Sequence, residues 1–236
     1  MIPTKPYRPT NTRFDLQPIE GACTPFSVLE ALLKFPGRIF HELRGSRAVA
    51  ATASLFMIMG FSLGLYGLVI GSLSGGEQLF LAPAKVFLGT LLCMLICLPS
   101  LYIFICLSGI DARFAGVAGE LLAAVCLMAL LLVGFAPVAW VFSQSTDSVA
   151  LMTLLHLAFW IIAVGCGLAL IGKSFNVADR RSHFHLRAWT LIFIIVCLQM
   201  MTSLRPIIGR ADTILPKEKE FFLTHFGKVL GDKGYR

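Results

Sequence analysis

The sequence predicts an all-α fold: a polytopic membrane helix bundle of about five transmembrane helices with amphipathic interfacial flanks. Hydrophobic residues make up 57% of the chain and charged residues only 14%, and the mean hydropathy is +0.81. A soluble domain carries roughly a quarter charged residues, so this chain has too few to cover a surface that faces water. Its apolar residues also occur in five long runs, and a helix needs about 20 of them to cross the hydrocarbon.

Four segments divide the chain. Residues 1–24 form a polar, proline-rich tail, because its prolines oppose a helix interior, and this tail lacks the apolar core of a signal peptide. Residues 25–46 are expected to form an amphipathic interfacial helix, residues 47–208 the five-helix transmembrane bundle, and residues 209–236 an amphipathic C-terminal tail.

The segment 25–46 carries apolar residues at spacings of three and four, opposed by charged residues. It is too polar to span a bilayer, so we expect it to lie along the membrane surface. Pro36 removes a backbone donor, which predicts a bend near Pro36-Gly37. A helix that binds a partner protein is the alternative interpretation.

Each of the five apolar runs is expected to cross the membrane. The fifth run has 17 residues before Arg205, so it requires a locally thinned bilayer or an extension through residues 206–208. The expected spans are residues 48–69, 86–107, 114–142, 149–171 and 188–204.

The distribution of Lys and Arg predicts the orientation. Residues 1–47 hold seven of these cations, whereas the first connection on the opposite side holds Lys85. This asymmetry places the N-terminus in the cytoplasm. With five spans the C-terminus would lie outside the cytoplasm, but the Lys and Arg residues after the fifth run favour a cytoplasmic C-terminus. The two indications agree if the fifth run does not cross the membrane. Anionic headgroups are expected to contact the basic connection 172–187, through Lys173, Arg180, Arg181 and Arg187.

Three polar residues are candidates for an ion or proton relay, because ionisable groups within spans often mark function. Glu120 lies nearly two turns into the third run, and Arg113 is seven residues earlier on the same helix face. The alternative is a carboxylate near the interface that is tied to Arg113 or to headgroup water. His156 lies early in the fourth run, where the alternative role is a hydrogen bond across helices.

Four glycines of the first run recur at spacings that allow another helix to approach closely. They are Gly60, Gly64, Gly67 and Gly71. The spacing supports packing within the bundle or against another subunit.

The sequence predicts neither a catalytic site nor a metal or cofactor site. Six of the seven cysteines lie within apolar runs, where cysteine behaves as a small hydrophobic residue. His183 and His185 have no fixed third ligand nearby. No phosphate-binding loop or nucleophile motif occurs, and no folded basic domain predicts nucleic-acid binding.

The layout of a polar cytoplasmic tail, a proline-bent amphipathic lead-in and five close-packed spans resembles the Yip family. That resemblance implies a membrane-organising or trafficking-adaptor role without catalysis. Three short segments look more like a group of uncharacterised bacterial multi-pass membrane proteins, and this resemblance implies that the membrane is the bacterial inner membrane. The three segments are LPSLYIF (98–104), GFAPV (134–138) and SLRPIIG (203–209).

The leading functional hypothesis is a non-catalytic accessory or scaffold subunit of a membrane protein assembly. Its expected partners are the lipid bilayer and other membrane subunits or further copies of the chain. The alternatives are a small transporter or channel that uses Glu120, and a Yip-like membrane-organising protein.

Overall fold

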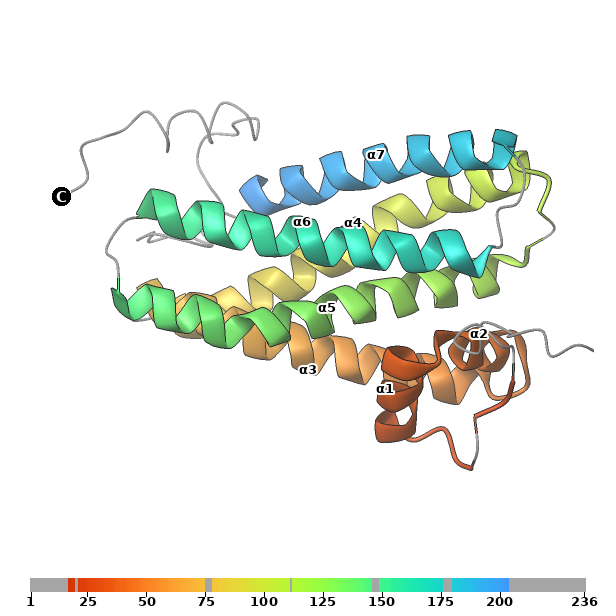
Figure 1. The fold of residues 1–236 in the computed structure, drawn as a ribbon, viewed down its shortest axis with the longest axis horizontal. Helices are drawn as coiled ribbons and strands as arrows, with labels where there is room; N and C mark the ends of the chain where they lie inside the picture. The colour runs from red at the N-terminus through yellow and green to blue at the C-terminus, as the bar shows by residue number, and fades with distance from the viewer. Residues whose placement is uncertain are drawn as a thin grey trace, which may run out of the picture.

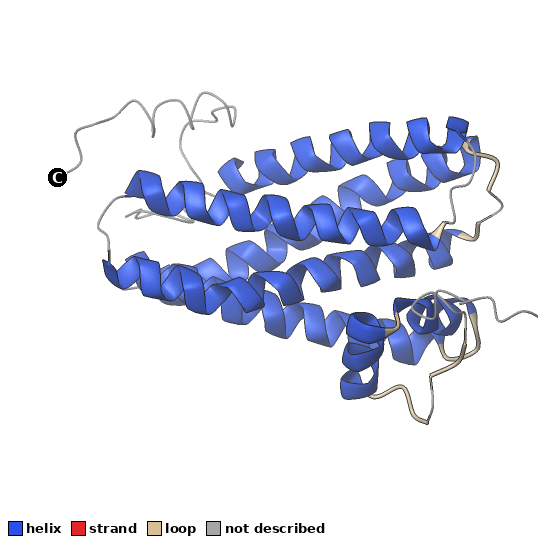
Figure 2. Cartoon of the chain, in the orientation of Figure 1, coloured by secondary structure: helices blue, strands red, loops and turns tan. Residues whose placement is uncertain are grey.

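A computed structural model describes residues 17–19, 21–74, 78–110, 112–145, 149–175 and 180–203. Within these ranges all regular structure is helical, which confirms the predicted fold class (Figures 1 and 2). Most of the predicted tail 1–24 and all of the predicted tail 209–236 lie outside the described residues. The helices are α1 (Pro25–Lys34), α2 (Pro36–Arg44), α3 (Ala48–Ser74), α4 (Gln78–Leu107), α5 (Phe114–Ser145), α6 (Val149–Ser174) and α7 (Arg180–Ser203).

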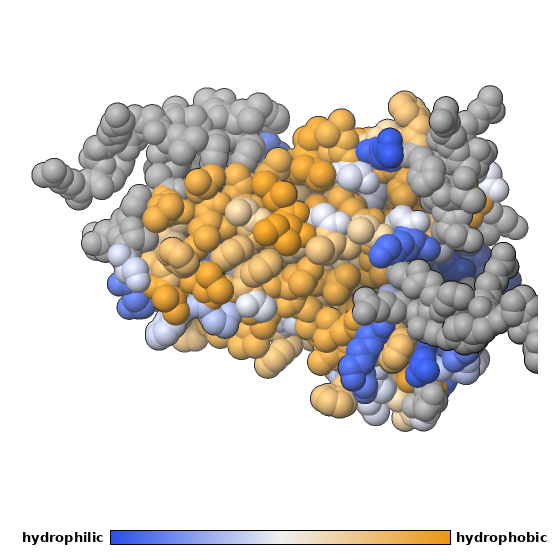
Figure 3. Space-filling view, in the orientation of Figure 1, coloured by the Kyte–Doolittle hydropathy of each residue, from blue (hydrophilic) through white to orange (hydrophobic). Residues whose placement is uncertain are grey.

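Four of the described helices are long and apolar enough to cross a membrane. Their apolar parts are Ala48–Ser72, Leu79–Leu107, Phe114–Ser145 and Leu154–Ser174. In α7 the apolar part is shorter, Phe184–Gln199, and the extension that the sequence suggested lies outside the described residues. Apolar residues cover most of the visible long face of the bundle, and hydrophilic residues gather towards its ends (Figure 3).

The helix α3 holds the bundle together, because it packs broadly against both α4 and α5. On one side α7 packs against α4, and on the other side α6 packs against α5, whereas α6 and α7 scarcely touch. The packing order is therefore α7, α4, α3, α5 and α6, with the two last helices of the chain at opposite ends of this order.

The first connection is shorter than the sequence suggested, because α4 begins at Gln78 and not near Val86. Pro83 therefore lies inside the helix, where its ring removes one backbone hydrogen bond. Pro83 packs against Gly67 of α3, which has no side chain. A Cβ atom built on Gly67 would lie 2.4 Å from the Pro83 Cα atom. Backbone contact between the two helices accompanies the early start of α4.

The amphipathic segment is broken into two helices at Phe35. Pro36 disfavours helical torsion angles in the residue before it, and Phe35 has φ −137° and ψ 65°. At the other end of α1, Thr24 and Ser27 form a capping box, in which each side chain accepts the other's backbone N–H. Figure 1 shows α1 running across the bundle axis.

The inner face of α1 and α2 packs onto the bundle, and part of the outer face of α1 remains apolar. Phe26 and Leu33, seven residues apart, are 76% and 58% exposed. The contacts are with α3 and α5. The buried apolar residues of α1 and α2 are Val28, Ala31, Leu32, Ile39, Phe40 and Leu43.

The basic connection is also shorter than expected, because α6 continues to Ser174 and α7 starts at Arg180. Residues 180–187 therefore belong to the first two turns of α7. Of the residues between these two helices, the structure describes Phe175.

Candidate functional site

Glu120 forms a buried ion pair that joins three helices. Its side chain, on α5, is 2% exposed. The guanidinium of Arg44, at the end of α2, donates to Glu120 Oε1 from Nε at 3.0 Å and from Nη2 at 2.6 Å. The hydroxyl of Ser174, the last residue of α6, donates to Glu120 Oε2. The carboxylate thus has a cation and a hydroxyl, which compensate the loss of water around it.

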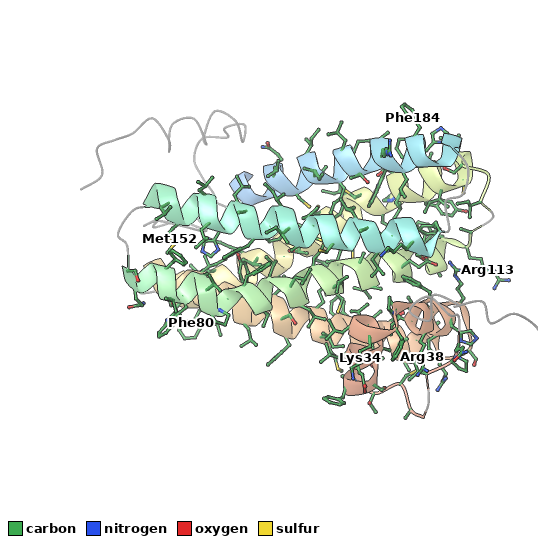
Figure 4. All side chains as sticks on the ribbon, viewed as in Figure 1. Lys34, Arg38, Phe80, Arg113, Met152 and Phe184 are labelled. Atoms are coloured by element: carbon green, nitrogen blue, oxygen red, sulfur yellow. The ribbon has the colours of Figure 1, made fainter. Side chains whose placement is uncertain are left out.

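Arg113 is not among these contacts, although it lies on the same helix face in sequence. Its side chain is exposed at the end of the bundle that also carries Lys34 and Arg38 (Figure 4). The pair that forms instead spans 76 residues of sequence. Nothing in the local pattern links Arg44 to Glu120, so sequence reasoning missed this partner.

A second carboxylate, Glu42, lies on α2 two residues before Arg44 and is also buried, which sequence reasoning did not predict. It is 2% exposed. Its Oε1 accepts the backbone N–H of Ile19 at 2.8 Å and Nη2 of Arg47 at 2.6 Å. Arg47 also donates to the carbonyls of Gly21 at 2.6 Å and Ile19 at 3.1 Å. Glu42 and Arg47 therefore anchor the described part of the N-terminal segment to the start of α3.

We call the end of the bundle that holds these two ion pairs the basic end. Each carboxylate has one arginine, so each pair is neutral. Cys23 lies nearby, and the pKa of its thiol is raised, first by partial burial and then by the charge of Glu42.

His156 lies within the bundle, far from the basic end. Its Nδ1 is 2.8 Å from the Tyr66 hydroxyl, and its Nε2 is buried without a hydrogen-bond partner in the described part of the chain. His156 and Ser174 share α6, and at about 1.5 Å of rise per residue they are roughly 27 Å apart. Because Ser174 touches Glu120, the structure does not bring Glu120 and His156 together.

Lys85 was expected in a connection and instead lies within α4. It is 3% exposed, and its Nζ has no hydrogen-bond partner among the described residues.

The residues expected to contact headgroups gather near the basic end, where α6 ends and α7 begins. Lys173 and Arg187 are both exposed. Arg180 and Arg181 start α7, and their side chains lie outside the described residues. Among the described residues, no group of three or more His, Cys, Asp or Glu side chains is arranged to hold a metal ion.

The four glycines of α3 do not behave alike. Gly67 faces the backbone of α4, and a Cβ on Gly60 would meet the Phe87 ring at 3.5 Å. A Cβ on Gly64 would meet nothing within 4 Å, and Gly71 is buried. Two of these positions therefore serve packing inside the bundle.

These helices and contacts define a class: an α-helical membrane bundle whose N-terminal helices are attached by buried ion pairs. No protein-family model, curated protein or solved structure matches the chain.

Proposed function

We propose that this protein is a non-catalytic integral membrane protein that serves as an accessory or scaffold subunit of a membrane protein assembly. The observation that carries the proposal is the contact set of Glu120, which is closed within the protein by Arg44 and Ser174. A carboxylate that relays ions or protons must exchange its partners. A carboxylate paired with a permanently charged guanidinium is better suited to fixing one arrangement of helices.

The two ion pairs support a rigid platform at the basic end. One pair joins α2 to α5 and α6, and the other joins α2 to the start of α3 and to the segment before α1. A platform held at several points presents the same surface to each partner, which lowers the ordering cost of association. The partners we propose are other membrane subunits or further copies of this chain.

We propose that the basic end faces the cytoplasm of a bacterial inner membrane. Arg44, Arg113 and Lys173 lie there, and the positive-inside rule assigns such an end to the cytoplasm. In this orientation, α1 lies at the depth of the headgroups, with Phe26 and Leu33 towards the lipid.

Purification at native abundance tests the scaffold role. The chain carries an affinity tag at its own locus and is extracted in a mild detergent, and co-purifying proteins are quantified by mass spectrometry against an unrelated multi-pass protein of equal abundance. We expect one or a few membrane proteins in fixed ratio to the chain. A lone monomer with no enriched protein would contradict the proposal.

A second candidate function is a small transporter or channel, and the buried Nε2 of His156 favours it. An imidazole nitrogen without a partner in a bundle interior can accept a proton from a passing water or substrate. Glu120→Gln and His156→Gln test this role in a flux or growth assay. An unchanged phenotype in both variants would remove its support.

A third candidate is a membrane-organising role of the kind that the resemblance to the Yip family implies. The course of α1 across the bundle axis, with Phe26 and Leu33 exposed, favours it. Reconstituted protein would then change the curvature of liposomes, and the double variant Phe26→Ser, Leu33→Ser would lose this effect. Unchanged liposomes with the unaltered protein would exclude the role.

A further inference from the structure

Three buried thiols form a row between α4 and α7. The sulfur atoms of Cys93, on α4, and Cys197, on α7, are 3.2 Å apart. Cys97 lies one turn from Cys93 on the same helix. The exposed fraction is 3% for Cys93, 1% for Cys97 and 8% for Cys197.

The row lies in the interface that attaches α7 to the bundle. Among the described helices, α7 packs broadly only on α4. The indole Nε1 of Trp189 donates to the Cys97 carbonyl and to the Ser100 hydroxyl, at 3.2 Å each. A bond between Cys93 and Cys197 would add a covalent attachment about two turns further along α7.

We propose that Cys93 and Cys197 are an oxidative modification site, at which a reversible disulfide fastens α7 to α4. A disulfide has an S–S length near 2.05 Å, so the two sulfur atoms need to approach by about 1.1 Å. Both partners come from packed helices, so the approach requires only a small adjustment of side chains and not a rearrangement of the bundle.

The reaction consumes both thiol hydrogens. The two S–H bonds break, one S–S bond forms, and two electrons and two protons pass to the oxidant. Because the pair lies within apolar helices, the oxidant is an apolar two-electron acceptor that dissolves in hydrocarbon, of the quinone or azo class. A quinone leaves as the hydroquinone, and an azo compound as the hydrazine. Reduction by a dithiol reverses the step.

Diamide, a membrane-permeant azo compound, tests the site on the full-length protein in liposomes. After treatment, remaining thiols are alkylated under denaturing conditions, and the peptides are mapped by mass spectrometry. We expect a peptide pair that joins Cys93 to Cys197, two hydrogen atoms lighter than the separate peptides and lost after treatment with dithiothreitol. Cys126, buried on α5 and without a paired thiol among the described residues, is the internal control and stays alkylated.

Three variants sharpen the test. Cys97→Ser retains the bond, whereas Cys93→Ser and Cys197→Ser each abolish it and leave the other thiol free for alkylation. The oxidised protein also unfolds at a higher temperature than the reduced protein, because the bond restricts the unfolded chain. Full alkylation of both cysteines after diamide, a mapped Cys93–Cys97 bond, or an unchanged unfolding temperature after bond formation would overturn the proposal.

Discussion

In the ion pair of Arg44 and Glu120, the carboxylate is buried and the arginine side chain is partly exposed. The side chain of Glu120 is 2% exposed, whereas that of Arg44 is 46% exposed. A buried carboxylate without a cation is costly, but a surface cation without a carboxylate is not. The physical role of Arg44 is therefore to keep Glu120 compensated where α2, α5 and α6 meet.

Arg44→Gln should destabilise the protein. Loss of one partner from a fully buried pair costs about 3–5 kcal/mol. Because about half of the Arg44 side chain is exposed and its charge is screened there, we expect a smaller loss of unfolding free energy, about 1–3 kcal/mol. Thermal unfolding in detergent measures the loss, and Arg113→Gln, at an exposed position outside this pair, is the matched control with a change within about 0.5 kcal/mol.

The double variant Arg44→Gln, Glu120→Gln should recover part of that stability, since the uncompensated charge is then gone. A coupling energy of about 0.5–3 kcal/mol in the double-mutant cycle is the expected result. Additive single changes would show that the two residues do not interact.

Cys23 should react slowly with alkylating reagents. The thiolate is the reactive form, and a raised pKa leaves less thiolate at pH 8. The rate of alkylation by iodoacetamide should therefore rise at a more alkaline pH than that of a free cysteine derivative. Glu42→Gln removes a negative charge that raises the Cys23 pKa, so its profile should move back to lower pH. A profile in Glu42→Gln that is unchanged or more alkaline would contradict this assignment.

At the scale of helices, the backbones of α3 and α4 are in close contact where Gly67 meets Pro83. A methyl group on Gly67 would lie 2.4 Å from the Pro83 Cα atom, and backbone cannot move aside as a side chain can. The early start of α4, against the helix-breaking tendency of proline, accompanies this close approach.

Gly67→Ala should cost about 1–3 kcal/mol, as overpacking usually does. Gly64→Ala is the matched control, because its added methyl meets nothing within 4 Å. It also replaces glycine with a better helix former. Unfolding of both variants in the same detergent gives the comparison, and equal losses would show that the contact with Pro83 does not set the packing.

The sequence predicts some of these helices better than others, for physical reasons. Composition and run length predict the four long spans, and Pro36 predicts the break near Phe35. The early start of α4 depends on contact with Gly67 of another helix, which local pattern does not encode. The partner of Glu120 likewise lies 76 residues away, on a segment that the sequence predicts to lie along the membrane surface.

For the whole molecule, the orientation can be tested with reporter fusions. With the basic end in the cytoplasm, a fluorescent protein fused after Ile110 should fluoresce, and alkaline phosphatase fused after Ser145 should be active. A phosphatase after Arg236 should be active if α7 crosses the membrane. Phosphatase activity after Ile110 would reverse the proposed orientation.

The scaffold role predicts that the chain is bound to at least one further protein subunit in the membrane. The most direct measurement is the mass of the intact particle, extracted at native abundance with its surrounding lipid into polymer nanodiscs and analysed by native mass spectrometry. We predict a main species heavier than the 25.8 kDa chain by the mass of at least one further protein subunit. A main species that contains one copy of the chain and lipid alone would contradict the account.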